Sequence, residues 1–123
     1  MTTPNTPELL AIYQHIKANP EEWDQRTYAS HTLCGTAFCF AGWAVVRAGG
    51  EAVRWYSYEP GREQADRATM PDGREVLIDD EAIAILGLDE DQAGELFFEE
   101  NDLGDIRNAI AAITGVDPEV VTP

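Results

Sequence analysis

The fold is decided by the stretch Cys34-Gly35-Thr36-Ala37-Phe38-Cys39-Phe40-Ala41-Gly42-Trp43-Ala44-Val45-Val46. No charged side chain occurs from Thr27 through Val46, although a quarter of the residues in the chain are charged. Because charged residues are almost never fully buried, a long segment without them marks the core. We expect a buried helix over residues 36–48, capped by Thr36 and ended at Gly49-Gly50 by a left-handed residue.

The remaining segments supply the elements that surround this helix. Thr6-Pro7-Glu8 predicts the start of an amphipathic helix that stops near Asn19-Pro20. Residues 24–33 indicate a connecting loop that carries Gln25, Tyr28 and His31 toward the core, residues 70–78 a turn and a strand, and residues 79–113 three further helices. The predicted fold is mainly α (α+β): a compact helical domain around a buried central helix with a small β-hairpin. Residues 1–123 are expected to form a single domain.

Charge is the strongest compositional signal. The chain has 23 acidic and 8 basic residues and a formal net charge of −15. Eleven of the acids, and no Lys or Arg, fall between Asp79 and Asp105. Such an imbalance disfavours direct binding to nucleic acids and acidic membranes, and it favours a basic protein partner.

The sequence also bears on where the protein is located. The first seven residues contain no basic region followed by an apolar run, so we expect no secretion signal. The unbroken apolar run from Ala37 to Val46 is ten residues long, which is too short to span a membrane. With only two cysteines, no disulfide framework is implied, and a cytoplasmic location is expected.

Three blocks of sequence together resemble those of a known group of proteins. They are Asn19-Pro20-Glu21-Glu22-Trp23-Asp24-Gln25, the pattern Cys-Gly-Thr-x-x-Cys-x-Ala-Gly-Trp-Ala that begins at Cys34, and Leu86-Gly87-Leu88 with Leu96-Phe97 and residues 101–106. The chain resembles small uncharacterised proteins of bacteria, especially actinobacteria, and of their phages. The resemblance implies a compact intracellular domain, located in the cytoplasm of the host cell if it is phage-encoded, and it implies no particular activity.

Three soft ligands lie within nine residues: His31, Cys34 and Cys39. With a fourth ligand they would form a zinc site, although the Cys-x4-Cys spacing is not the short spacing that zinc prefers. A thiol near a helix N-terminus with a histidine nearby is also a candidate nucleophile. A disulfide between the two cysteines is a further possibility, and the commonest use of free cysteine is as a small buried hydrophobe. We expect the last of these, and neither a metal ion nor another cofactor.

Asp89, Asp91, Gly94 and Glu100 match part of a calcium-binding loop. The same residues also predict a helix capped by Asp89 and Gln92, and a helix does not wrap a cation. We therefore favour the helix.

The sequence favours a non-enzymatic acidic binding or regulatory protein that docks a basic protein partner or mimics the charge of a nucleic acid. The candidate contact residues are Asp89, Asp91, Glu95, Glu99, Glu100, Trp55 and Tyr56. The two aromatic residues fit an exposed contact patch and a strand packed on the core equally well. The alternative is a cysteine-dependent or metal-assisted enzyme centred on His31, Cys34 and Cys39. The oligomeric state is not indicated.

Overall fold

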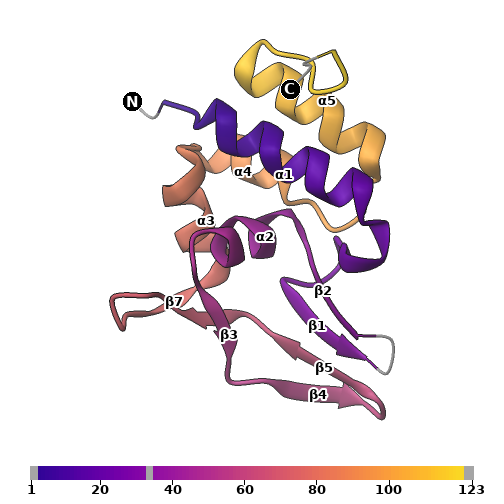
Figure 1. Cartoon of the computed structure of the whole chain (residues 1–123), viewed down its shortest axis with the longest axis vertical. Helices are drawn as coiled ribbons and strands as arrows, with labels where there is room; N and C mark the ends of the chain where they lie inside the picture. Colours follow the sequence, from indigo (N-terminus) through magenta and orange to yellow (C-terminus); the bar gives the residue numbers. More distant parts are fainter. Residues whose placement is uncertain (1–2, 33–34, 121–123) are drawn as a thin grey trace.

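The computed structural model describes the backbone of residues 3–32 and 35–120, and their side chains except those of His31, Thr32, Tyr58 and Glu59. This part of the chain contains five α-helices, one short 3-10 helix and seven strands. Most of the helices gather at one end of the molecule, and the strands form two antiparallel sheets at the other (Figure 1). The helices are α1 (Thr6–Ala18), η1 (Pro20–Glu22), α2 (Phe40–Arg47), α3 (Ile78–Leu86), α4 (Glu90–Leu96) and α5 (Leu103–Thr114).

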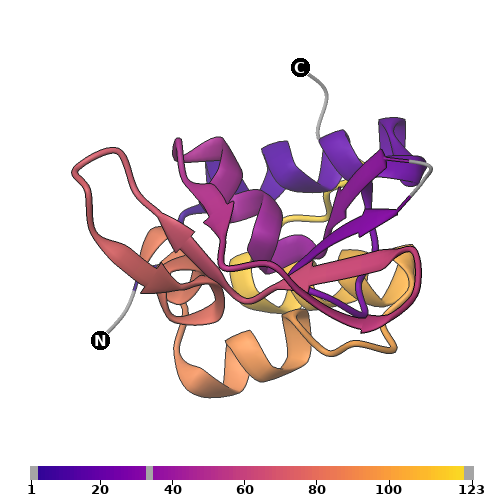
Figure 2. The same cartoon turned by 90° about the horizontal axis from the view of Figure 1, so that it is seen from below.

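The larger sheet has the strand order β2 (Gly35–Phe38), β1 (Ala29–Thr32), β5 (Arg62–Ala65), β4 (Tyr56–Glu59). The smaller sheet has the order β3 (Glu51–Val53), β6 (Arg67–Thr69), β7 (Glu75–Leu77). Two chain segments each contribute one strand to each sheet, since β3 leads into β4 and β5 leads into β6 (Figure 2).

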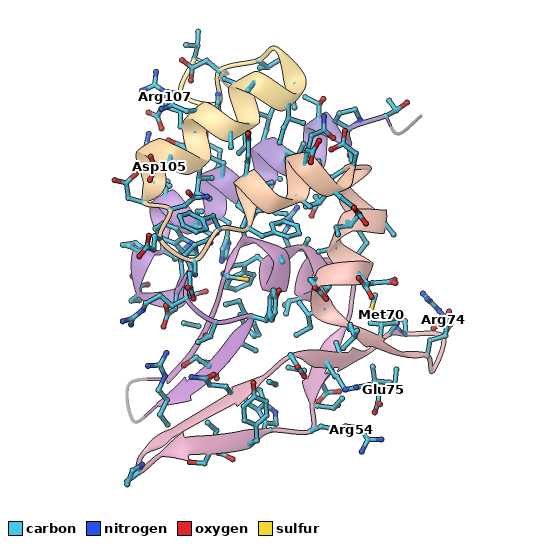
Figure 3. All side chains as sticks on the ribbon, turned by 180° about the vertical axis from the view of Figure 1, so that it is seen from behind. Arg54, Met70, Arg74, Glu75, Asp105 and Arg107 are labelled. Carbon is cyan, nitrogen blue, oxygen red and sulfur yellow. The ribbon has the colours of Figure 1, made fainter. Side chains whose placement is uncertain are left out.

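The passage between the two sheets requires a bend in the backbone. Arg54, between β3 and β4, has a φ angle of +57°, which is costly for a residue with a Cβ atom. Its guanidinium lies 2.6 Å from a carboxylate oxygen of Glu75 on β7 (Figure 3). On the other segment, Asp66 separates β5 from β6, and its carbonyl accepts a hydrogen bond from the amide of Ile78 at the start of α3. The bend is thus fixed to the neighbouring elements.

The prediction of a mainly helical domain with one small hairpin is wrong. Part of the predicted hairpin is confirmed: the turn at residues 70–74, in which the Met70 amide donates to the Arg74 carbonyl, is followed by the strand β7, which pairs with β6. The prediction missed β1, β2, β5 and β6. These strands are short and contain few β-branched residues, and β5 has the sequence Arg-Glu-Gln-Ala, which favours a helix. Their strand conformation comes from pairing between distant segments, which local propensity does not report.

The segment that decides the fold also differs from expectation. Thr36 lies in β2, and the helix begins four residues later than predicted, at Phe40, where Cys39 is the N-cap residue and its sulfur accepts from the Gly42 amide. Gly49, with a φ angle of +93°, follows the helix end, as expected. Residues 40–45 are buried, and α2 packs against α1 and α3. Part of the uncharged stretch therefore serves as a strand and part as a helix.

The capping and periodicity predictions are confirmed for α4 and in part for α1, but α3 begins at Ile78 and neither Asp79 nor Asp80 caps it. The predicted inward face of α1, residues Leu9, Ile12, Tyr13 and Ile16, is buried, although the N-cap is Asn5 and not Thr6. Both α4 and α5 begin with a capping box, formed by Asp89 with Gln92 and by Asp102 with Asp105. Across the described residues, no helix is long and apolar enough to cross a membrane.

Gly42 lets α2 lie directly against the segment that leads into β1. A Cβ atom built at this position would lie 2.1 Å from the carbonyl oxygen of Tyr28, well inside van der Waals contact. Backbone lies on both sides of this contact, so the clash cannot be relieved by rotating a side chain. The close approach therefore requires glycine.

We predict that Gly42→Ala destabilises the protein by about 2–4 kcal/mol, because helix and strand must move apart. Gly94 in α4 is the matched control, since a Cβ atom there would meet nothing within 4 Å. Gly94→Ala should stabilise by about 0.5–1 kcal/mol through helix propensity alone. Urea unfolding measured on both variants tests the prediction, and equal effects of the two substitutions would contradict it.

Candidate functional site

The candidate site is built around Gln25, a buried polar residue with 7% of its surface exposed. Its side-chain amide group donates to the carbonyls of Leu96 and Phe98, at 3.0 and 3.2 Å. Its side-chain oxygen accepts from the indole of Trp23 and from the backbone amide of Phe40, at 3.0 and 3.1 Å. Gln25 therefore joins the segment after η1 to the start of α2 and the end of α4.

Two adjoining hollows lie where these segments meet the larger sheet. The first has a volume of about 300 Å³ and extends from Gln25 and Cys39 to Tyr56 on β4 and Asp66 after β5. The second is more open, has a volume of about 710 Å³ and lies between residues 23–26 and residues 99–102. Both are lined by Gln25, Arg26 and Glu99, so the two hollows adjoin.

Cys39 lines the inner hollow as a buried thiol with 2% of its surface exposed. Burial raises the pKa of Cys39 to about 12, against the opposing effect of the hydrogen bond from the Gly42 amide. The thiol is therefore protonated at neutral pH and is a poor nucleophile and metal ligand. Cys39 matches the expectation of a core cysteine.

The other two members of the predicted cysteine and histidine group cannot be placed. Cys34 and the side chain of His31 lie outside the described residues. Within the described residues, no three His, Cys, Asp or Glu side chains are grouped in a way that would hold a metal ion. The segment that resembled a calcium loop is the capped helix α4.

Tyr28, Tyr56 and Phe97 bring aromatic surface to the inner hollow. Burial, and after it the negative charge of the nearby Asp79 carboxylate, raises the pKa of Tyr28 to about 12. Tyr28 thus stays uncharged. Asp66 and Glu99 add two carboxylates to the same hollow, against the single guanidinium of Arg26.

The structure brings only some of the predicted contact residues together. Tyr56, which is 38% exposed, and Glu99 line the same hollow. Glu100 lines the outer hollow. Trp55 is half-buried against the core and borders a different hollow beside Phe38 and Val46, so the predicted aromatic pair does not form one patch. The remaining acids, Asp89, Asp91 and Glu95, are exposed at the start and along the side of α4.

The charges are segregated across the molecule. Each of the eight Lys and Arg side chains already forms an ion pair within the chain, at N–O distances from 2.6 to 3.8 Å. Of the eleven acids between Asp79 and Asp105, Glu81 pairs with Arg74. In the described part of the chain the other ten have no ion-pair partner. Helices α3 to α5 therefore carry uncompensated negative charge.

Comparisons with known proteins give no family: no protein-family model, no curated protein and no solved structure matches the chain.

We predict that Gln25→Glu destabilises the protein by about 3 kcal/mol at pH 7, because a buried carboxylate would face the Leu96 and Phe98 carbonyls without a proton to donate. The folded state should raise the pKa of this new carboxyl above its unfolded value of about 4.3. The loss relative to wild type should therefore be smallest below about pH 4.3 and grow as the pH rises through that value.

Urea unfolding between pH 4 and pH 7 measures this difference. Gln92→Glu is the control, because Gln92 is on the surface and its side chain acts as a hydrogen-bond acceptor, a role that a carboxylate keeps. A constant difference between Gln25→Glu and wild type across this pH range would contradict the proposed role of the Gln25 amide.

A second prediction concerns Cys39, studied in a Cys34→Ser background so that one thiol remains. With a pKa of about 12, about one thiol in ten thousand is ionised at pH 8. Native protein should therefore react with a disulfide reagent such as dithionitrobenzoate only at the rate of unfolding, and at once in denaturant. Fast reaction of the native protein would show that the Cys39 thiol is accessible and reactive, and it would support the alternative of a cysteine-dependent enzyme.

Proposed function

We propose that this protein is a non-enzymatic binding protein whose acidic helical surface docks a basic protein partner. The acidic helical surface is defined as Asp89, Glu90, Asp91, Glu95, Glu99 and Glu100, all of which are exposed. The proposal is supported above all by the segregation of charge. Every basic side chain is already engaged within the chain, while this surface has no internal ion pairs among the described residues.

This arrangement differs from one that only keeps a protein soluble. Solubility requires net charge but not its concentration on one set of helices. Carboxylates gathered on α4 repel one another, and a basic partner relieves that repulsion when it binds. Complementary charges of this kind accelerate association and exclude partners of the wrong sign.

The surface also offers apolar area to a partner. Phe98 is 52% exposed, and it lies beside Gly94, Ala109 and Ala112 in a hollow of about 420 Å³ between α4 and α5. Glu95 and Asp105 line the same hollow (Asp105 is labelled in Figure 3). An apolar centre with charged residues around it is the usual composition of a protein interface.

The partner class follows from the same charges. Proteins that bind nucleic acids have the exposed basic surface that this chain would complement. A surface of clustered carboxylates would compete with phosphates for such a protein, which is charge mimicry of a nucleic acid.

We predict that replacing Glu90, Asp91 and Glu95 by their amides weakens partner binding about tenfold or more, because three interfacial charges are lost. The partner is first isolated on immobilised wild-type chain at low salt, identified by mass spectrometry and purified. Its dissociation constant is then measured by calorimetry for wild type and variant between 50 and about 300 mM salt. Binding to wild type should weaken steeply with salt, and the salt dependence of the variant should be shallower.

The matched control removes the same number of charges elsewhere. Glu21, Glu51 and Glu63 are exposed, lie outside the acidic helical surface and have no ion-pair partner among the described residues. Their replacement by Gln should change the affinity about twofold at most. Equal weakening by the two triple variants, or binding that is indifferent to salt, would overturn the proposal. If the partner binds DNA, an excess of this protein should also displace the DNA.

A further inference from the structure

We infer that the inner hollow, lined by Tyr28, Tyr56, Asp66, Phe97 and Glu99, is a recognition pocket for one arginine side chain of the docked partner. This inference rests on the proposed function and names the group that the partner would insert. It is carried by the combination of aromatic faces, unpaired carboxylates and a buried hydroxyl in one hollow.

The aromatic lining suits a flat cation. Tyr28, Tyr56 and Phe97 come from three separate segments and line the same space. Both tyrosine and phenylalanine attract a guanidinium group placed over the ring. Because Tyr28 holds its proton at neutral pH, its ring presents the face of a neutral phenol. Guanidinium stacks on such faces better than the compact, strongly hydrated ammonium of lysine.

The carboxylates supply the opposite charge. Asp66 lies in the bend between β5 and β6, and Glu99 lies in the loop after α4, so they approach the hollow from the two halves of the fold. Among the described residues neither has an ion-pair partner. The one basic residue at the hollow, Arg26, already pairs with Asp24 at 3.3 Å, and 71% of its side chain is exposed. The hollow is therefore short of positive charge.

A buried polar atom points to the same ligand. The hydroxyl oxygen of Thr27 is buried and has no hydrogen-bond partner within the described part of the chain, and Thr27 lines the hollow. Buried hydroxyls are nearly always hydrogen-bonded, so an orphan here calls for a partner that the chain itself does not provide. Guanidinium carries five N–H donors and no acceptor, which suits two carboxylates and a hydroxyl.

The dimensions favour a single side chain over a larger ligand. A volume of about 300 Å³ is at the lower end of the range for small-molecule pockets. The outer hollow adjoins it and is lined in part by Asp24, Glu100 and Asp102. Residues that flank the inserted arginine would lie there, also against carboxylates.

The test uses the full chain and a capped tripeptide, acetyl-Gly-Arg-Gly-amide, followed by NMR shifts of the backbone amides. We expect saturable shifts at Thr27, Tyr28, Tyr56 and Phe97. The matching citrulline peptide, which has the same shape without the charge, should bind about tenfold more weakly, and the lysine peptide should fall between the two.

Three substitutions in the hollow should each weaken binding of the arginine peptide about fivefold: Asp66→Asn, Tyr56→Ala and Thr27→Val. Asp66 and Tyr56 are not in the buried core, so these variants are expected to fold, and thermal unfolding confirms it. Asp80→Asn is the control, because Asp80 is an exposed acid on α3 that lines neither hollow. It should leave the affinity unchanged.

Several outcomes would overturn the inference. These are equal binding of the arginine and citrulline peptides, equal weakening by Asp80→Asn and Asp66→Asn, or shifts confined to α4. If a free diamine such as putrescine binds more tightly than the peptide, the ligand of the hollow is a small molecule and not a protein side chain.

The triple variant Glu90→Gln, Asp91→Asn, Glu95→Gln separates this inference from the proposed function. This variant should bind the partner more weakly than wild type does. Its affinity for the arginine peptide should stay within about twofold of wild type, because none of the three residues lines the inner hollow. If partner binding depends on the acidic helical surface but the arginine peptide does not bind, the inferred pocket is wrong and the proposed function still stands. If the arginine peptide binds but partner binding does not depend on the acidic helical surface, the proposed function is wrong and the inferred pocket still stands.

Discussion

The side-chain amide of Gln25 is the contact that holds α2 and the end of α4 to the segment between η1 and β1. Each of its hydrogen-bonding positions is occupied: two carbonyls at the end of α4 accept from it, and an indole and the first amide of α2 donate to it. A buried polar group satisfied in this way contributes modestly, but breaking the set leaves the Trp23 indole and the Phe40 amide without their acceptor. The Leu96 and Phe98 carbonyls would keep hydrogen bonds from Asn101. The positions of α2 and α4 are therefore linked through one residue in the segment between η1 and β1.

A second constraint acts at the same place. The Gly42 backbone lies so close to the Tyr28 carbonyl that no side chain fits between them. Gln25 and Tyr28 belong to the same short segment, so this segment is held against α2 at both of its ends. The hollow lined by Gln25, Thr27 and Tyr28 is accordingly bounded by backbone that is fixed before any ligand arrives, and such preorganisation lowers the entropy lost on binding.

Several features of the fold were predictable because they depend on neighbours in sequence. The inward face of α1, the capping boxes led by Asp89 and Asp102, and the turn at residues 70–74 all follow from spacing or turn chemistry. The larger sheet could not be predicted from the sequence. Ala29 pairs with both Phe38 and Ala65, and nothing in those residue types specifies the pairing. The candidate site could be predicted only in part for the same reason. Glu99 was among the predicted contact residues, but Asp66 follows β5 of that sheet, and its place in the same hollow depends on the fold. The sequence did place Gln25 and Tyr28 in a connecting segment that leads toward the central helix.

The bend between the two sheets connects the hollow to the acidic helices. Asp66 lines the hollow while its carbonyl accepts from the first amide of α3, and Asp79 on the same helix is close enough to Tyr28 to raise the pKa of its hydroxyl. Glu99 follows α4, whose last residue, Leu96, is held by Gln25. The carboxylates of the hollow are thus anchored to α3 and α4, the same helices that carry the unpaired charge. A basic partner attracted by the helices would meet the hollow at their edge, so that long-range attraction and local recognition act on one ligand. Attraction alone would select for charge, whereas the hollow adds a requirement for the shape and donors of one side chain.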